Sequence, residues 1–334
     1  MIKKEIESPF ANCNAKLNIA KTKRSFRKEE FDVYEYYYVC EETKKDFATN
    51  ESTDLTLKQL YNQYRERHKI LFPLQIKQLR EKYGLSAIRM SEVLGFGENV
   101  YRQYEKGEIP NKSNANFLNL MKHSENFIEL AQKSETISDI ELAELNKTIS
   151  FFNEKNDSKR FKKYLRNYSD EIDQFTGYVL RYYKKFANMI IFFLKQNDRA
   201  FTTRLNKYLF YSDFIAYKYT GSSISGYNYC ALEKGPVPDN YKQLFYELWQ
   251  ENYVENIEQQ IGKKETEKFV PAKEFDSSIF NEDELEIIKY ISDNFKFKKT
   301  EELIKLSHRE KGWIENISEH KTISYQEYAP LLNL

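Results

Sequence analysis

The sequence predicts a mainly α-helical protein of several domains, with a small β-containing module at its N-terminus. The chain has 334 residues, which is more than one hydrophobic core usually serves. Most of its apolar residues recur at helical spacing, but the stretch EEFDVYEYYYVC (Glu29–Cys40) is rich in the β-branched and aromatic residues that favour a strand. Glycines and prolines divide the helical stretches into short elements.

The order of these elements predicts four parts along the chain. We expect a β-containing module at residues 1–68, a helix-turn-helix domain at 69–130, a helical connector at 131–171 and a predominantly α-helical domain with short β elements at 172–334. Pro73 marks a boundary near the start of the second part, because it interrupts the helical spacing of the residues before it.

Local signals place several of the elements. Ser138 with Glu141 has the spacing of a capping box and predicts a helix start in the connector. Asn281 with Glu284 predicts another helix start in the last part. Between these, the polar stretch VENIEQQIGKKETEKFVPAK is typical of a β-hairpin.

Charge is balanced over the whole chain but unevenly placed. The 52 Lys and Arg residues face 51 Asp and Glu, so bulk basicity does not draw this protein onto nucleic acid. Residues 58–106 carry ten basic and five acidic side chains (+5), 155–204 carry twelve and five (+7), and 247–286 carry four and twelve (−8). Such a chain can hold DNA with one part and keep an acidic part away from it, although solvated helix faces give the same counts.

Cysteine usage and hydropathy predict a cytoplasmic protein. Cys13, Cys40 and Cys230 are odd in number and widely spaced, so no disulfide framework is expected. The first residues, MIKKEIESPF, lack the apolar run of a signal peptide. The most apolar stretch, Phe186–Leu194, is far shorter than the roughly 20 residues of a membrane span. We therefore expect no membrane segment.

The stretch LSAIRMSEVLGFGENVYRQYEKG (Leu85–Gly107) has the pattern of a helix-turn-helix. In this motif a supporting helix anchors a short exposed helix that enters the major groove of DNA. Residues 85–94 fit the supporting helix and residues 97–105 the reading helix, around a turn at Gly95. Short helical hairpins without a DNA function share the pattern.

The two faces of the expected reading helix differ in chemistry. Val100, Tyr101 and Tyr104 are spaced to face inward. The outer face is left to residues whose amide and guanidinium groups suit base edges, namely Asn99, Arg102 and Gln103. Lys106 and Arg89 are the candidates for phosphate contacts.

Gly97 and Asn99 precede this helix, and Tyr104, Glu105 and Gly107 close it. The arrangement resembles the helix-turn-helix of MqsA-type antitoxins, where Gly-x-Asn and Tyr-Glu-x-Gly recur. The resemblance implies that Asn99 and Gln103 read bases in operator DNA. Family members often carry Arg where Gln103 stands, so the target sequence is expected to differ while the binding mode is shared.

The same family has a zinc ribbon of two Cys-x-x-Cys pairs before this unit. The matching stretches are Ser8–Ala11 and Cys40–Thr43, which keep only Cys40 of the four ligands. One thiolate cannot fill a tetrahedral zinc site, Cys13 is two residues out of register and His68 is distant. We expect a degenerate module without metal, packed by aromatic residues: Phe26, Phe31, Tyr34, Tyr36 and Tyr38.

Ordered motifs recur at separate places between Phe201 and Ala329. In chain order they supply Leu205, Lys207, Leu209, Tyr211, Asp213, Gly221, Tyr229, Ala231, Gly235, Pro236, Val237, Pro238, Tyr241, Ser307, His308, Gly312, Trp313 and Tyr325. They resemble the Panacea domain, also called the SocA-like domain, found in antitoxins paired with many different toxins. The resemblance implies that this part of the chain binds and neutralises a toxin protein.

Gly235 and its neighbouring prolines predict a rigid turn that holds aromatic residues on a preformed surface. The candidates for toxin contact are Lys207, Tyr211, Asp213, Tyr227, Tyr229 and Tyr241. Leu205, Leu209, Ala231 and Trp313 are assigned to the core instead. The polar candidates also suit an interior role, and Asp213 suits a cap or bridge within the fold.

No catalytic site is predicted. Of the histidines only His308 lies in a motif, with Ser307 and Glu310 near it in sequence, and a structural hydrogen bond explains it equally well. The chain has no phosphate loop, H-E-x-x-H or G-x-S-x-G motif. We expect neither an enzyme nor a bound cofactor.

These observations predict an antitoxin that neutralises a cognate toxin by direct binding and represses its own operon. A homodimer or a toxin–antitoxin hetero-oligomer is expected, because two operator half-sites require two readers. Two alternatives stay open. A proteolytic adaptor would deliver the toxin to a protease, and a stand-alone transcription repressor would have no dedicated partner.

Overall fold

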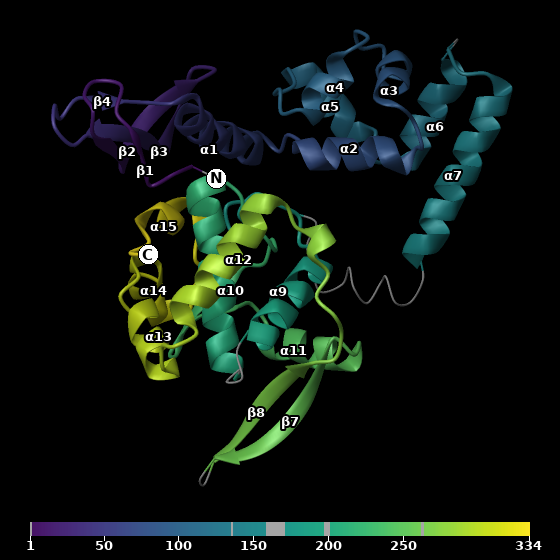
Figure 1. The fold of residues 1–334 in the computed structure, drawn as a ribbon. Coiled ribbons are helices and arrows are strands. Elements are labelled where there is room, and N and C mark those ends of the chain that lie inside the picture. The colour runs from purple at the N-terminus through teal and green to yellow at the C-terminus, as the bar shows by residue number, and fades with distance from the viewer. Residues whose placement is uncertain (1, 135, 158–170, 197–200, 262–263) are drawn as a thin grey trace. The chain divides into compact units, whose positions relative to one another are not determined.

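The computed structural model describes residues 2–134, 136–157, 171–196, 201–261 and 264–334 (Figure 1). Internal contacts divide the chain into two compact units: unit 1 comprises residues 1–60 with 171–334, and unit 2 comprises 61–170. Among the described residues helices predominate, and the strands all belong to unit 1, which agrees with the predicted mainly α-helical class. None of the described helices combines the length and the hydropathy that a membrane crossing needs.

Unit 1 begins with a four-stranded antiparallel sheet in chain order: β1 (Glu5–Glu7), β2 (Asn14–Phe26), β3 (Glu29–Cys40) and β4 (Asp46–Phe47). The predicted strand at 29–40 is confirmed as β3. It pairs with β2 through a tight turn in which Arg27 and Lys28 take positive φ angles of 48° and 69°. The aromatic side chains expected to pack this module are buried at Phe31, Tyr34, Tyr36 and Tyr38, and half-buried at Phe26.

This sheet is part of unit 1 and not a free-standing module. The side-chain amide of Gln59, on helix α1 (Asn50–His68), exchanges hydrogen bonds of 2.9 and 3.0 Å with the backbone of Tyr34. The Tyr34 hydroxyl donates to the carbonyl of Glu327 (3.0 Å), and Lys58 Nζ donates to the carbonyl of Thr220 (2.8 Å). The structure therefore groups residues 1–60 with 171–334, which differs from the expected boundary after residue 68.

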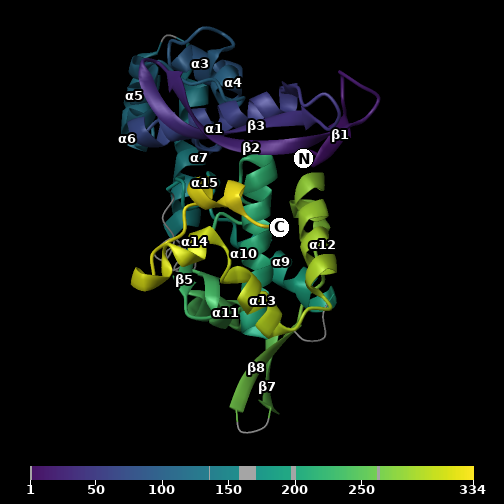
Figure 2. The same ribbon diagram turned by 90° about the vertical axis from the view of Figure 1, so that its left-hand side faces the viewer.

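The helical part of unit 1 is built around α10 (Thr202–Thr220), in which every residue from Arg204 to Tyr219 is buried. Figure 2 shows α10 running through the middle of this unit. The elements around it are α9 (Tyr183–Gln196), α11 (Tyr241–Gln250), α12 (Glu282–Phe295), α13 (Thr300–Ser307), α14 (Lys311–Ile314) and α15 (Tyr325–Tyr328), with 3₁₀ turns at Ser277–Ile279, Ile317–Glu319 and Ala329–Leu331. The predicted capping box of Asn281 and Glu284 starts α12.

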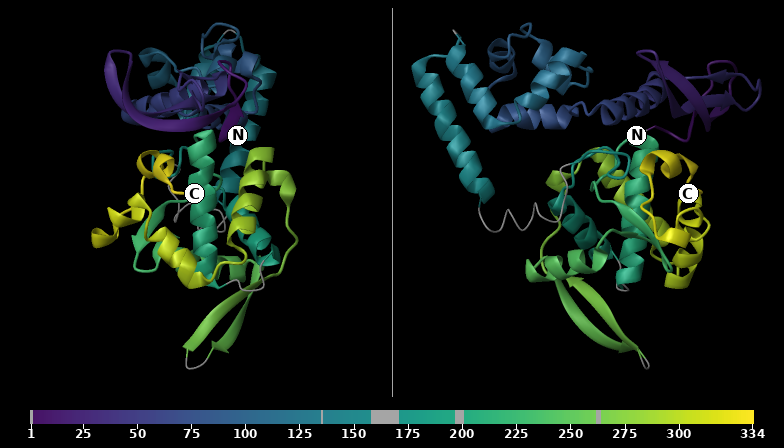
Figure 3. Two further views of the ribbon diagram at one scale, coloured as in Figure 1. Left: turned by 60° about the vertical axis from the view of Figure 1, so that its left-hand side comes forward. Right: turned by 180° about the vertical axis from the view of Figure 1, so that it is seen from behind.

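Two antiparallel hairpins complete unit 1. The shorter one pairs β5 (Tyr229–Leu232) with β6 (Gly235–Pro238). The longer one pairs β7 (Val254–Ile261) with β8 (Lys264–Pro271) and confirms the hairpin expected at this place. It extends away from the helices of the same unit in both views of Figure 3.

Unit 2 is helical wherever it has regular structure in the described residues. After the end of α1 it contains α2 (Pro73–Lys82), α3 (Ala87–Val93), α4 (Val100–Glu105), α5 (Lys112–Leu120), α6 (Ser124–Lys133) and α7 (Asp139–Asp157). Pro73 occupies the first turn of α2. Leu145 and Ile149 of α7 join the core of α2–α6, so this part of the expected connector packs with the preceding helices of unit 2. Connector residues 158–170 lie outside the described residues.

Candidate functional sites

The stretch predicted to form a helix-turn-helix contains two short helices, α3 and α4. Ser86 caps α3, since its hydroxyl accepts a hydrogen bond of 3.1 Å from the backbone N–H of Arg89. After α3 the chain turns at Gly95, whose φ of +65° lies in the left-handed region that favours glycine. α4 follows at Val100–Glu105, within the residues 97–105 expected for the reading helix.

The inner face of α4 is anchored by two buried tyrosines. The Tyr101 hydroxyl donates to the carbonyl of Ile76 on α2 (2.8 Å), and its backbone N–H donates to Ser91 Oγ on α3 (3.1 Å). The Tyr104 hydroxyl accepts a bond from the amide of Asn114 on α5 (2.8 Å). α4 is therefore held by three neighbouring helices, which fixes the direction of its outer face.

An ion pair also fastens α4 to α2. Arg80 Nε lies 2.6 Å from Glu105 Oε1, and the two side chains are only 17% and 15% exposed. Arg80 also donates to the carbonyl of Leu85, at the start of the supporting segment (2.8 Å). This one guanidinium group thus links α2, the segment that leads into α3 and the end of α4.

The outer face of α4 carries the four predicted DNA-contact residues other than Arg89. Asn99, Arg102, Gln103 and Lys106 are all exposed. Asn99 occupies the N-cap position of α4, but its side chain makes no capping hydrogen bond there. The side-chain amides of Asn99 and Gln103 are thus presented to solvent from one short, firmly anchored helix. Contact with DNA stays a prediction for all four.

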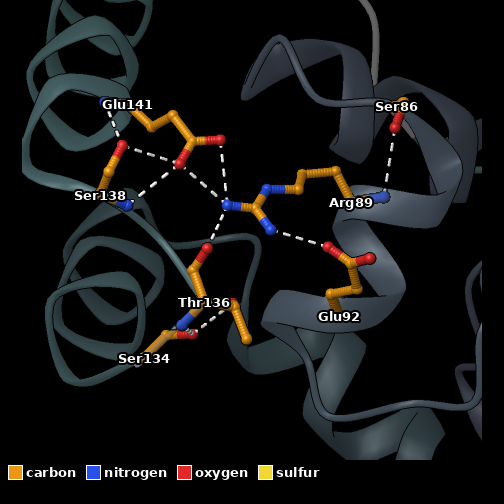
Figure 4. Close-up of polar contacts among 7 residues, drawn as sticks. All are labelled: Ser86, Arg89, Glu92, Ser134, Thr136, Ser138 and Glu141. Atoms are coloured by element: carbon orange, nitrogen blue, oxygen red, sulfur yellow. Dashed lines mark hydrogen bonds and ion pairs between the residues drawn. The ribbon is translucent and has the colours of Figure 1, made fainter.

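Arg89, the fifth candidate for DNA contact, forms ion pairs within unit 2. Figure 4 shows its guanidinium group between two carboxylates: Nη1 lies 2.7 Å from Glu92, and Nη2 lies 2.9 Å from both carboxylate oxygens of Glu141. Nη2 also donates to the carbonyl of Thr136. The arginine is thus paired with two carboxylates within unit 2, and its side chain is 24% exposed. Its expected phosphate contact stays a prediction.

The partner of Arg89 is held in place by the predicted capping box. The Glu141 carboxylate accepts bonds from the backbone N–H (3.0 Å) and hydroxyl (2.9 Å) of Ser138. Hydrogen bonds from Ser138, and then from Arg89, keep the pKa of Glu141 below its usual range. The cap at the start of α7 thereby tethers α3, a link that local sequence signals do not show.

In unit 1, a buried lysine lies against the short hairpin. Lys207 on α10 has no exposed surface, and its Nζ donates to the carbonyl of Pro236 on β6 (2.7 Å). Burial lowers the pKa of Lys207 to about 7. Gly235 has a φ of +94°, and a Cβ there would lie 2.7 Å from Lys207 Nζ and closer still to Ser307 Oγ. The motif glycine thus lets the hairpin approach α10.

A buried carboxylate organises the segment after α10. Asp213 accepts four hydrogen bonds: from the backbone N–H groups of Ile224 and Ser225 (2.8 Å each), from Ser225 Oγ (2.6 Å) and from the Tyr229 hydroxyl (2.7 Å). Burial raises its pKa, and these bonds oppose the rise. Asp213 therefore bridges within the fold, the alternative that the sequence left open.

Five of the six candidates for toxin contact lie in the interior. Lys207, Tyr211, Asp213 and Tyr229 are 0% exposed and Tyr227 is 2% exposed, whereas Tyr241 is partly exposed. Side chains with 0–2% exposure offer almost no surface to a partner protein, so their burial argues against direct toxin contact by these five. Lys207, Tyr211 and Asp213 lie on α10, which is buried from Arg204 to Tyr219, and their polar atoms hydrogen-bond within unit 1.

The three residues considered for catalysis are engaged in separate contacts. His308 stacks on Trp313 with ring centroids 3.8 Å apart. Ser307 Oγ donates to the carbonyl of Ile304 (2.9 Å), and Glu310 accepts from the Tyr211 hydroxyl (3.0 Å). Burial raises the pKa of the Glu310 carboxyl. These contacts give each side chain a structural use.

Sequence reasoning missed an exposed aromatic pair on α11. Tyr246 and Trp249 are 52% and 45% exposed, and their ring centroids lie 5.8 Å apart. The opposite face of α11 is buried through Leu244, Phe245 and Leu248. Tyr246 and Trp249 have i, i+3 spacing and lie away from these apolar positions on the helix. This spacing is the sequence signal from which the pair could have been predicted.

At the N-terminal module, the two thiols nearest the expected ribbon lie together. Cys13 Sγ and Cys40 Sγ are 3.4 Å apart. In the part of the chain that the structure describes, no group of three or more His, Cys, Asp or Glu side chains could hold a metal ion. The absence of zinc from this module stays a prediction.

Comparison with known proteins identifies one segment of the chain. Residues 205–314 match the model of the family described as Antitoxin SocA-like, Panacea domain. The matched segment is about a third of the chain and runs from α10 to the end of α14. It contains Lys207, Asp213, the β5–β6 hairpin and α11. No curated protein matches this chain.

Proposed function

We propose that this protein is the antitoxin of a toxin–antitoxin pair, and that its Panacea domain neutralises the toxin by direct binding. The observation that carries the proposal is the match of residues 205–314 to the SocA-like antitoxin family. The sequence resemblance covers a longer stretch, Phe201–Ala329, and includes motif residues beyond the matched segment, such as Tyr325. In the structure Tyr325 is buried and its hydroxyl donates to the carbonyl of Tyr227 (2.8 Å), so this motif residue packs with the domain.

The toxin-binding surface that we propose is the outer face of α11. Tyr246 and Trp249 offer a large aromatic area of low conformational entropy, the kind of anchor that dominates protein interfaces. Glu247 and Glu251 of the same segment begin the acidic tract 247–286, whose net charge is −8. Aromatic faces bordered by carboxylates suit lysine and arginine side chains, so a basic toxin surface fits this site.

The second activity in the proposal is binding of operator DNA through α4. Its exposed face presents two amides, a guanidinium group and an ammonium group, from Asn99, Gln103, Arg102 and Lys106. The surrounding segment 58–106 has a net charge of +5, which favours approach to phosphates. A dimer would place two reading helices on two half-sites.

Co-expression with the product of the neighbouring gene tests the proposal. We expect the chain to restore growth of cells that express the toxin, to co-purify with it as a stable complex, and to retard its own upstream DNA on a gel. Failure to rescue growth and to form a complex would overturn the antitoxin assignment. Rescue that requires a cellular protease, with loss of the toxin and no lasting complex, would identify a proteolytic adaptor instead.

A further inference from the structure

Two thiol groups face each other at one end of the N-terminal sheet. Cys13 directly precedes β2 and is partly exposed, whereas Cys40 is the last residue of β3 and is buried. Their sulfur atoms are 3.4 Å apart, closer than the sum of two sulfur van der Waals radii allows without a shared proton. The third cysteine, Cys230, is in a different part of unit 1, on β5, and lies 3.9 Å from Thr322 Oγ1.

Backbone hydrogen bonds hold the two segments that carry the thiols. Ser8 N–H donates to the carbonyl of Cys13 (2.9 Å), and Lys44 N–H donates to the carbonyl of Cys40 (3.1 Å). Glu41 N–H donates to the carbonyl of Asn14 (3.1 Å), which joins the two segments directly. The pair is thus pre-positioned by the sheet and does not depend on the side chains alone.

The surroundings of Cys40 favour its thiolate. The Ser8 hydroxyl, followed by the hydroxyl and backbone N–H of Thr43, hydrogen-bonds the sulfur and lowers the pKa of Cys40 to about 6. A thiolate is the form that attacks an oxidised sulfur. Ser8 and Thr43 stand where the resembled ribbon has zinc-binding cysteines, and hydroxyl groups are not the N and S ligands that structural zinc uses.

We propose that Cys13 and Cys40 form a reversible disulfide when the protein meets a hydroperoxide. Cys13, the accessible member of the pair, passes its proton to the Cys40 sulfur and attacks the terminal oxygen as a thiolate. The O–O bond breaks, the leaving alkoxide or hydroxide takes up that proton, Cys13 becomes a sulfenic acid and Cys40 is again a thiolate. The Cys40 thiolate then attacks the Cys13 sulfur, the S–O bond breaks, and the hydroxide that leaves is protonated to water. Two thiols and one hydroperoxide yield one disulfide, one water and one alcohol, or two waters where the oxidant is hydrogen peroxide.

The geometry requires little movement for this reaction. A disulfide has an S–S length of about 2.05 Å, so the two sulfur atoms approach each other by roughly 1.4 Å. The new bond would fasten the start of β2 to the end of β3, next to the existing bond between Glu41 and Asn14. The oxidised module would then be covalently closed at the end of the sheet opposite its Arg27–Lys28 turn.

Treatment of the purified full-length protein with hydrogen peroxide tests this inference. We expect the mass to fall by about 2 Da, the reactive thiols to fall from three to one, and peptide mapping to link Cys13 to Cys40. Dithiothreitol should restore all three thiols. Cys230→Ser is the matched control and should form the same linked peptide, whereas Cys13→Ser and Cys40→Ser should not.

Three outcomes would overturn the proposal: thiols of Cys13 and Cys40 that stay as alkylatable as that of Cys230, a disulfide that involves Cys230 or a second molecule, or oxidation that dithiothreitol does not reverse. If Cys40→Ser does not fold, the peptide map of the wild-type chain and the behaviour of Cys13→Ser still decide the question. The readout does not depend on toxin or DNA binding, so it stands apart from the proposed function.

Discussion

The Nζ atom of Lys207 lies 2.7 Å from the carbonyl oxygen of Pro236, and the lysine side chain has no exposed surface. Among the residues that the structure describes, the ammonium group donates to a backbone carbonyl and forms no ion pair with a carboxylate. Desolvation accordingly lowers the pKa of Lys207 to about 7. The link between α10 and the β5–β6 hairpin is therefore sensitive to pH.

The first prediction concerns this sensitivity. Because the folded-state pKa of Lys207 is below its unfolded value of 10.5, the unfolded chain binds more protons between about pH 7 and 10.5. The free energy of unfolding should therefore rise with pH through this window, and Lys207 should contribute no slope below it. Urea unfolding from about pH 6.5 to 9.5 should show a steeper rise for the wild type than for Lys207→Met.

Some slope should remain in the variant, since burial also lowers the pKa of Lys218, to about 8, and acts in the same direction. Identical pH dependence in the wild type and Lys207→Met would show that the lysine is not desolvated in the folded protein. The comparison uses slopes, because loss of the bond to Pro236 lowers the stability of the variant at every pH.

The second prediction concerns the ion pair that fastens α4 to α2. Replacing Arg80 with Leu leaves the Glu105 carboxylate, only 15% exposed, without its partner. We expect a loss of about 1–3 kcal/mol in unfolding free energy, less than for a fully buried pair because solvent still reaches the site. Thermal unfolding measures the loss, and operator affinity should fall with it because α4 is no longer fixed.

A matched control lies on the same helix. Lys77 and Glu81 on α2 form a 3.8 Å pair whose side chains are both 53% exposed, so Lys77→Leu should change stability by less than about 0.5 kcal/mol. An equal effect of the Arg80 and Lys77 substitutions would contradict the role given to the Arg80–Glu105 pair.

Local structure was predictable from the sequence wherever a residue's neighbours along the chain decide its conformation. The capping boxes at Ser138 and Asn281, the strand that ends at Cys40 and the two helices around Gly95 all depend on residues within a few positions of one another. The burial of Tyr101 and Tyr104 was predictable from helical spacing in the same way, because the other face of α4 is exposed.

Burial of the charged motif residues was not predictable, because a helix that is enclosed on all sides has no polar face for a periodicity to reveal. The partners of Lys207 and Asp213 come from residues 224–236, and that of Tyr211 from Glu310. Arg89 is a similar case, because its partner Glu141 is 52 positions away. Contacts between residues far apart in sequence determine the partners of these side chains. The exposed positions of Tyr246 and Trp249, in contrast, could have been predicted from a helical wheel of α11.

The third prediction tests base reading by the amides on α4. Replacing Asn99 or Gln103 with Ala should weaken binding to the cognate operator by about 1–3 kcal/mol if each contacts a base. Both side chains are exposed, so unfolding should not change and toxin neutralisation should survive. Gln132→Ala, at an exposed glutamine on α6, is the matched control. Full operator affinity in both variants would remove the base-reading assignment.

The fourth prediction separates Lys106 from Arg89 by the effect of salt. A phosphate contact releases a counterion, so Lys106→Gln should reduce the slope of log K against log salt concentration by about 1. Arg89→Gln should leave that slope unchanged, because the arginine is bound to Glu92 and Glu141. It should instead lower the melting temperature of the protein. A reduced salt slope for Arg89→Gln would show that Arg89 contacts a phosphate group.

The last prediction places the toxin on the outer face of α11. Truncating Tyr246 and Trp249 together to Ala removes the exposed aromatic pair but none of the buried side chains of that helix, so the domain should keep its stability. If the pair is the anchor, each truncation should weaken toxin binding by about 2 kcal/mol, or roughly thirtyfold, and the double variant should no longer rescue growth. Phe297→Ala is the control, since that side chain is 89% exposed at the end of α12 and offers a similar apolar area. If the double variant rescues growth and forms the complex at wild-type levels while Phe297→Ala does not, the toxin contacts the surface around Phe297 and not α11. The proposed antitoxin function would then still hold.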